Sequence, residues 1–154
     1  METTQQTIFA GVDVAKDELE VCVMPGEHRI TVARNGEGVA KLLEFFKQHG
    51  VESVIVESTG GYDRIVTAAC LEAELRTSLI NPRQAKHFGI ALGLLAKNDR
   101  IDARTLALFG DRIRPREMEK TPEKQQELHD LVTRRRQLVA MQAAEKIRRK
   151  AEVV

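Results

Sequence analysis

The stretch IFAGVDVAKDELEVCVM, residues 8–24, decides the fold class of this chain. It contains two short runs rich in β-branched residues, 8–14 and 19–24, which are joined by AKDE. A third run of this kind, HRITVA at 28–33, follows Pro25-Gly26. Short apolar runs separated by turn residues predict three consecutive strands that pair as an antiparallel meander.

After the meander, the chain alternates between helical and strand patterns. Residues 36–50 place apolar side chains on one helical face and end at a glycine. SVIVES at 53–58 and RTSLIN at 76–81 are apolar strand patterns, with a helical pattern at 62–74 between them, and Pro82 suits the first turn of a helix. Crossovers through helices require parallel pairing, so the order predicts a mixed five-stranded sheet with flanking helices. This is the order of an RNase H-like α/β fold, and it also fits other α/β sheets.

Composition limits the number of domains and the classes of function. The chain has 154 residues, of which 42% are hydrophobic and 31% charged, which suffices for one core and one appendage. Only 4% are aromatic and none is Trp, which argues against a base-stacking surface or an aromatic sugar site.

The charge is unevenly distributed. From Thr121 onward there are 8 basic and 5 acidic residues (+3), which leaves 16 basic and 18 acidic residues upstream (−2). A basic tail on an acidic body is compatible with a polyanion partner or with a solvated helix face.

The cysteines and the polar start indicate the compartment. Cys22 lies in a strand-like run and Cys70 in a helical run, without the spacing of a zinc site, so we expect two buried free thiols. No uncharged apolar stretch approaches roughly 18 residues, and METTQQT lacks the features of a signal peptide. We expect a cytoplasmic protein.

The C-terminal third differs from the rest. Segment 115–124 combines prolines with mixed charges, which predicts a linker between a domain at 1–114 and a basic helix at 125–154. The apolar stripe of that helix consists of Leu128, Leu131, Val132, Leu138, Val139 and Met141. So narrow a stripe on so long a helix needs a partner, as in a coiled coil.

Four acidic residues are the candidate catalytic and metal-binding groups. Asp13 and Glu57 lie at or near the ends of two apolar strands, where a charge must be paired, solvated or bound to a cation. Asp99 and Asp102, three residues apart, would share one face of a helix. If the strands are adjacent and parallel, the four carboxylates meet at one sheet edge and imply Mg²⁺ or Mn²⁺ for phosphoryl transfer on nucleic acid. Taken singly, each residue also fits a turn, a helix cap or a solvated surface.

Basic residues and a glycine pair surround these positions. Lys97, Arg100 and Arg104 flank the aspartate pair and either receive phosphates or pair with the carboxylates. STGGY at 58–62 would allow a nucleic-acid backbone to approach closely, or is an ordinary strand-to-helix turn. The histidines lack ligand spacing and are expected on the surface: His28, His49, His87 and His129.

Three segments resemble the motif blocks of the DEDD insertion-sequence transposases, a family that includes Piv/MooV-type DNA invertases and bridge-RNA-guided recombinases. They are GVDVAKDELEVCV, VIVESTGGY and KNDRIDARTLA, and the resemblance spans residues 8–114. It implies a RuvC-like domain that coordinates Mg²⁺ through the family's four acidic residues, which fall on Asp13, Glu57, Asp99 and Asp102. Asn98 stands where family members often have Thr or Ser, a minor departure because this position is not a ligand.

The resemblance also implies partners. The family's arginine-rich helix pairs protomers, and its domain contacts DNA or a guide RNA. Residues 134–150 hold seven basic residues and one acidic residue, enough for a salt-sensitive phosphate contact. The candidate phosphate contacts on this helix are Arg134, Arg135, Arg136, Arg148 and Arg149. Family members continue into a domain with a nucleophilic serine, so we expect this stretch alone to bind metal and nucleic acid but to recombine poorly or not at all.

Two other readings remain open. An actin-like or sugar-kinase-like nucleotide-binding domain also places an Asp in a glycine-containing strand before a hairpin, as GVDVAK does. Such proteins need a second lobe and a glycine-rich adenosine site, neither of which is found in this sequence. The other is a non-catalytic module that dimerises through the long helix.

Overall fold

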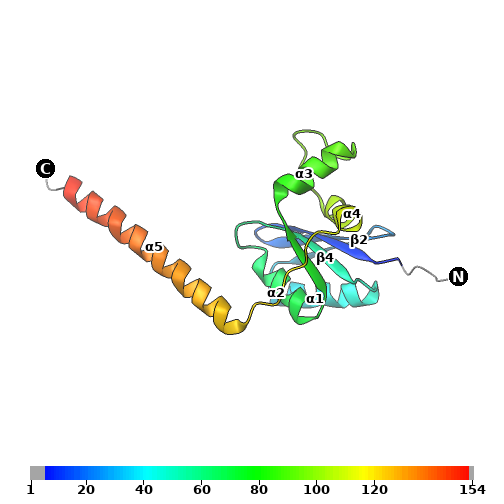
Figure 1. Ribbon diagram of the computed structural model, residues 1–154, viewed down its shortest axis with the longest axis horizontal. Helices are drawn as coiled ribbons and strands as arrows, with labels where there is room; N and C mark the ends of the chain where they lie inside the picture. Colours follow the sequence, from blue (N-terminus) through cyan, green and yellow to red (C-terminus); the bar gives the residue numbers. More distant parts are fainter. Residues whose placement is uncertain (1–5, 153–154) are drawn as a thin grey trace. The chain divides into compact units, whose positions relative to one another are not determined.

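The computed structural model describes residues 6–152, which form two compact units that divide between Glu119 and Lys120. The first unit is a five-stranded sheet with helices on both faces (Figure 1). Its strands are β1 (Phe9–Val14), β2 (Glu18–Met24), β3 (His28–Ala33), β4 (Ser53–Glu57) and β5 (Arg76–Ile80). Its helices are α1 (Gly36–Gln48), α2 (Arg64–Glu72), α3 (Pro82–Ala91) and α4 (Ala103–Ile113).

The sheet has the strand order β3-β2-β1-β4-β5, so β1 lies at its centre. The first three strands form an antiparallel meander, in which Gly11 pairs with Cys22. β1 pairs in parallel with β4, Val12 opposite Val56, and β4 pairs in parallel with β5. The predicted mixed α/β sheet is therefore confirmed. β1 lies at the centre because the hairpin with β2 occupies only one of its edges. The other edge is free to pair with β4, which the chain reaches by the crossover through α1.

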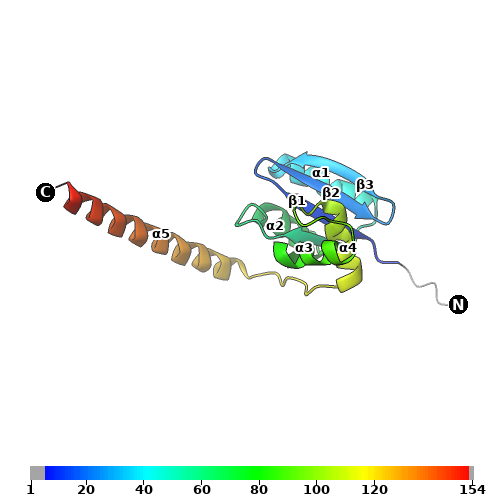
Figure 2. The same ribbon diagram turned by 90° about the horizontal axis from the view of Figure 1, so that it is seen from above.

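The two faces of the sheet carry separate apolar clusters. Alternate residues of β1 and β4, such as Val12 and Val56, point into a cluster under α1 and α2. The intervening positions, such as Phe9 and Ile55, pack with Leu106 and other residues of α4 in the second cluster. Figure 1 shows the two helix pairs on opposite sides of the sheet, and Figure 2 looks down on the side that carries α3 and α4. The neighbouring strands β1 and β4 are buried on both faces because helices cover both sides of the sheet there, whereas the edge strand β3 is largely exposed.

The cysteines are free and fully buried, as predicted. Burial raises the pKa of the Cys70 thiol to about 12. The structure therefore keeps this side chain in its neutral form as part of the apolar core.

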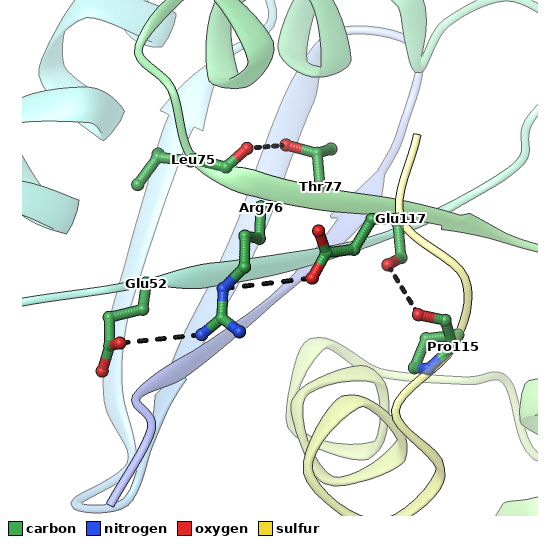
Figure 3. Close-up of polar contacts among 7 residues, drawn as sticks. Glu52, Leu75, Arg76, Thr77, Pro115 and Glu117 are labelled. Atoms are coloured by element: carbon green, nitrogen blue, oxygen red, sulfur yellow. Dashed lines mark hydrogen bonds and ion pairs between the residues drawn. The ribbon is translucent and has the colours of Figure 1, made fainter. Parts of the chain in front are cut away.

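Residues 115–118 lie along the outer edge of β5 (Figure 3). The backbone N–H of Met118 donates to the carbonyl oxygen of Thr77 at 2.7 Å, and the Ser78 hydroxyl donates to the Pro115 carbonyl at 3.4 Å. Arg76 lies between two carboxylates, 3.6 Å from Glu52 and 4.0 Å from Glu117. The first residues of the predicted linker thus cover an edge strand, which would otherwise expose unpaired backbone groups.

The second unit is the helix α5 (Glu123–Ala151), none of whose residues is buried. The predicted apolar stripe is exposed along its whole length, with Leu128 at 61% and Met141 at 63%. Among residues 6–152, no helix is both long enough and apolar enough to cross a membrane.

Candidate functional site

Asp13 and Glu57 lie side by side at the carboxyl ends of β1 and β4. Each comes one residue after the last paired position of the two parallel strands, Val12 opposite Val56. Since side chains alternate between faces, Asp13 shares the face of Gly11 and Glu57 the face of Ile55, which is the face covered by α4. The structure therefore brings these two predicted residues together.

The electrostatics of the pair reflect this closeness. Burial raises the pKa of both carboxyls. The charge of Asp13 further raises the pKa of Glu57, whereas the guanidinium of Arg100 lowers the pKa of each. Two half-buried carboxylates that repel each other gain stability from a cation between them, and Arg100 supplies part of this positive charge.

Asp102 is held near the pair by the first turn of α4. It is the N-cap of this helix, and its Oδ1 accepts a hydrogen bond from the backbone N–H of Thr105 at 2.8 Å. Its charge raises the pKa of Asp13, which places the two carboxylates within electrostatic reach. The turn lies this close because Gly11 has no side chain: a Cβ there would lie 2.0 Å from the Ala103 carbonyl oxygen.

The expectation that Asp99 and Asp102 share a helical face is wrong. α4 begins at Ala103, and Asp99 lies in a preceding turn that is not helical. There the Asp99 Oδ2 accepts from the backbone N–H of Ala96 at 2.7 Å, while its own N–H donates to the Ala96 carbonyl at 3.0 Å. The side chain of Asp102 caps the helix, so the chain cannot continue as helix backwards to Asp99.

The donor set matches a hard divalent cation in its chemistry, because every candidate ligand is a carboxylate and Mg²⁺ prefers oxygen ligands. The geometry is less complete. Nowhere between residues 6 and 152 do three Asp, Glu, His or Cys side chains lie close enough to hold an ion together. Of the four predicted ligands, the fold gathers Asp13 and Glu57, keeps Asp102 within reach of Asp13, and places Asp99 in a separate turn.

Two further acidic residues lie at this sheet edge and were missed by the sequence analysis. Glu20 is the antiparallel partner of Asp13 on β2, and its charge raises the pKa of Asp13. The sequence signal for Glu20 is the alternation of side chains in LEVCVM. Combined with the pairing of this strand with β1, it places Glu20 beside Asp13. Asp63 is 6% exposed and accepts hydrogen bonds within the loop 58–63, which no sequence pattern revealed.

The basic residues around the aspartates have different surroundings. Arg104 pairs with Glu27 of the β2–β3 turn, so in this structure its guanidinium is engaged with a carboxylate. Arg100 lies within electrostatic reach of Asp13 and Glu57, whereas Lys97 lies exposed on the loop before α4.

The predicted phosphate contacts of α5 are all exposed. Two of them make bonds along the helix. Arg148 lies 3.0 Å from Glu145, and Arg134 donates to the Gln137 side chain at 3.4 Å. These contacts are local and leave the basic character of the helix surface intact.

Solved structures share this fold. The structure of RuvC from Thermus thermophilus matches with a TM-score of 0.54 at 19% sequence identity, over 73% of this chain and 100% of that chain. T. thermophilus RuvC in complex with a Holliday junction substrate matches with a TM-score of 0.50 at 20% identity, over 70% of this chain and 96% of that one. At this level of identity the likeness shows the fold, which is RuvC-like and thus RNase H-like.

Sequence comparisons give the family. The pilin gene-inverting proteins of Moraxella lacunata and Moraxella bovis are each 25% identical to this chain over 113 residues, which are 70% of this chain and 35% of the relative. The chain thus spans about a third of the length of these relatives. A DEDD family model described as "Transposase" matches residues 10–152. Because this match covers nearly the whole sequence, the chain belongs to the DEDD transposase family.

Proposed function

We propose that this chain carries the metal-dependent phosphoryl-transfer centre of a DNA transposase or site-specific recombinase. The observation that carries the proposal is the parallel register of β1 and β4, which sets Asp13 beside Glu57 at the carboxyl end of the sheet. Sites in α/β sheets form at this end of the strands. Membership of the transposase family supports this reading over the nucleotide-binding alternative.

The proposed cofactor is Mg²⁺ or Mn²⁺. Asp13, Glu57 and Asp102 would hold it, because these three carboxylates share one electrostatic neighbourhood. Asp99 joins them in the proposal on the family resemblance alone. When bound, the metal supplies a positive charge that activates the attacking oxygen and stabilises the charge that develops on the phosphodiester.

The residues of the chain prepare the site for this chemistry. The charge of Asp13 disfavours the ionised form of Glu57 beside it, so the combined charge of the two carboxylates favours a divalent cation over a monovalent one. Arg100 is already in reach of both carboxylates. A bound cation would take over this neutralising role, and the Arg100 guanidinium would then be available to contact a phosphate of the bound strand.

The substrate of the proposal is DNA. A RuvC of the same fold was solved in complex with a Holliday junction substrate, and the matched Moraxella proteins are named for inverting pilin genes. Lys97, Arg100 and Arg104 would contact phosphates beside the carboxylates. The basic residues of α5 would add a second, salt-dependent contact to DNA or to a guide RNA.

We further propose that α5 pairs with α5 of a second copy. Its apolar side chains are exposed in the single chain, and Leu131 and Leu138 are one heptad apart. Exposed leucines at this spacing form the seam of a coiled coil. The homodimer would present two carboxylate sites to one nucleic-acid substrate.

Titration calorimetry with Mn²⁺ tests the metal site. We expect the wild-type chain to bind Mn²⁺ and the double variant Asp13→Asn with Glu57→Gln to lose this binding, because these changes keep shape and remove charge. Glu37→Gln with Glu44→Gln, two exposed positions of α1, is the control for a loss of two charges.

The same variants separate the catalytic reading from its rival. We expect Mn²⁺-dependent nicking of a branched or supercoiled DNA by the wild type and by the control, but not by the Asn/Gln variant. Equal Mn²⁺ binding by all three proteins rules out the proposed centre. DNA binding without Mn²⁺ binding would favour the non-catalytic dimerising module.

A further inference from the structure

Tyr62 stands apart from the other aromatic residues of the chain. The sequence has five Phe, one Tyr and no Trp, and all six aromatic residues lie within the described part of the chain. The Phe residues are buried or half-buried, whereas Tyr62 is 44% exposed. Tyr62 is therefore the aromatic residue that leaves its ring most open to contact with another molecule.

The loop that presents Tyr62 is fixed in shape. It connects β4 to α2, and Tyr62 comes five positions after Glu57. The buried carboxylate of Asp63 accepts hydrogen bonds from the Thr59 N–H at 3.0 Å, from the Thr59 hydroxyl at 3.2 Å and from the Gly61 N–H at 3.4 Å. Gly60 and Gly61 have φ values of 69° and 122°, which favour glycine. The loop, and Tyr62 with it, thus leaves the sheet at the end of β4 that carries Glu57.

Arg34 covers one side of the Tyr62 ring. Its guanidinium carbon lies 4.6 Å from the ring centroid, a cation–π contact. The Nε of Arg34 donates to the carbonyl oxygen of Lys16 at 2.6 Å, and its backbone N–H donates to the Asp17 carbonyl at 2.9 Å. The arginine is thus anchored to the β1–β2 turn, directly after the strand that carries Asp13.

The chemistry of this pair fits one unpaired nucleotide. An exposed aromatic ring stacks with a base of any sequence, and an arginine beside it binds the adjoining phosphate. A paired base inside a duplex does not offer its face, so the base must lie outside the stack. A low aromatic content argues against an extended stacking surface, but a single base needs only a single ring.

We propose that Tyr62 and Arg34 together bind one unpaired nucleotide of the DNA. This nucleotide would lie next to the phosphodiester bond that is positioned at the carboxylates. We call these two residues the Tyr62–Arg34 pair. This inference rests on the proposed function, because it assigns a preferred substrate form to the same site. It makes single-stranded or locally opened DNA the preferred ligand over an intact duplex. The alternative to this inference is that the contact between Tyr62 and Arg34 is purely structural and stiffens the loop between β4 and α2.

The chain offers a direct reporter for the test. Tyr62 is its only tyrosine and there is no tryptophan, so tyrosine emission comes from this ring alone. We expect a single-stranded oligonucleotide, titrated into the full chain, to quench this emission by stacking, and a blunt duplex of the same sequence to quench it much less. Anisotropy of a labelled oligonucleotide measures binding independently.

Variants give the second measurement. We expect Tyr62→Leu to weaken single-strand binding about 10-fold, as the loss of one stacked base does, and Tyr62→Phe to retain it. Duplex affinity should change little in either variant. Arg34→Gln should weaken single-strand binding more than Arg83→Gln, a matched loss of charge on the exposed start of α3. Thermal unfolding of each variant shows whether the fold is intact.

The outcomes separate this inference from the proposed function. If the wild type binds the single strand by anisotropy but the tyrosine emission does not change, the Tyr62–Arg34 pair is structural only and DNA binding stands. If Tyr62→Leu fails to fold, the quenching of the wild-type emission and the affinity of Tyr62→Phe still test whether Tyr62 stacks on a base. Absence of any binding overturns both the pair and the DNA-binding part of the proposed function, whereas Mn²⁺ binding is measured separately.

Discussion

Gly11 of β1 lies against the carbonyl oxygen of Ala103, at the start of α4, so closely that no side chain fits between them. A Cβ built on Gly11 would lie 2.0 Å from this oxygen and 2.6 Å from the backbone nitrogen of Ala107. Both neighbours are backbone atoms and cannot turn away as a flexible side chain would. This contact sets how near the capping residue Asp102 comes to Asp13.

We expect Gly11→Ala to destabilise the fold by about 1–3 kcal/mol, because overpacking forces α4 away from the sheet. Urea unfolding measures this change. Gly36→Ala is the matched control, since a Cβ there meets no atom within 4 Å. The same Gly11 variant should bind Mn²⁺ more weakly than the control, because Asp102 moves with the helix. An unchanged urea midpoint for Gly11→Ala would contradict the close packing.

Asp102 combines a capping role with its proposed role as a metal ligand, and two substitutions separate these roles. Asp102→Ser keeps an oxygen that accepts from the Thr105 N–H, whereas Asp102→Ala does not. We expect the Ala variant to be about 1 kcal/mol less stable than the Ser variant in urea unfolding. Both should lose Mn²⁺ affinity in calorimetry. If the Ser variant binds Mn²⁺ like the wild type, Asp102 is a cap and not a ligand.

The stability of the metal-free chain should depend on the ionisation of Glu57. Burial and the charge of Asp13 raise the pKa of Glu57 above its ordinary value of 4.5. The folded state then binds the proton more tightly than the unfolded state, so this contribution to stability is complete below pH 4.5 and is lost as the pH rises through the raised pKa.

Glu57→Gln cannot ionise at this position and so does not lose stability as the pH rises. We therefore expect it to be more stable than the wild type at pH 7 but not at pH 4. The gain should be at most about 1 kcal/mol, because the side chain is half-exposed and water screens its charge. Urea unfolding with a chelator present, from pH 4 to pH 7, measures it. Glu44→Gln, on the exposed face of α1, should show no such trend. A pH-independent difference between Glu57→Gln and wild type would refute the raised pKa of Glu57.

The exposed stripe of α5 predicts a concentration-dependent dimer. Leu128, Leu131 and Leu138 are 61%, 63% and 49% exposed in the single chain, which is costly for a long amphipathic helix. Sedimentation velocity should show dimers for the full chain and monomers after removal of residues 120–154. Leu131→Asp with Leu138→Asp should have the same effect without shortening the chain. Monomers of the intact chain across micromolar concentrations would exclude pairing through α5.

The local sequence determined the elements of the fold and its order of strands and helices. The short, mostly apolar runs at 8–14 and 53–58 favour strands that are buried on both faces of a sheet. The helical crossover between them enforces parallel pairing. The sequence left open whether these two strands are adjacent, and the structure supplies this because β4 pairs with the edge of β1 that the hairpin leaves free.

Only the tertiary structure decided the surroundings of these two carboxylates. Periodicity did not fix where the helix begins, and in the structure Asp102 caps α4 while Asp99 closes a separate turn with Ala96. Glu20 and Arg100 come to the pair from other segments of the chain, and Arg34 reaches Tyr62 across the sheet edge. Spacing along a chain reports only short-range periodicity. Contacts between distant segments depend on how closely the backbones pack, and here one missing Cβ at Gly11 sets that distance.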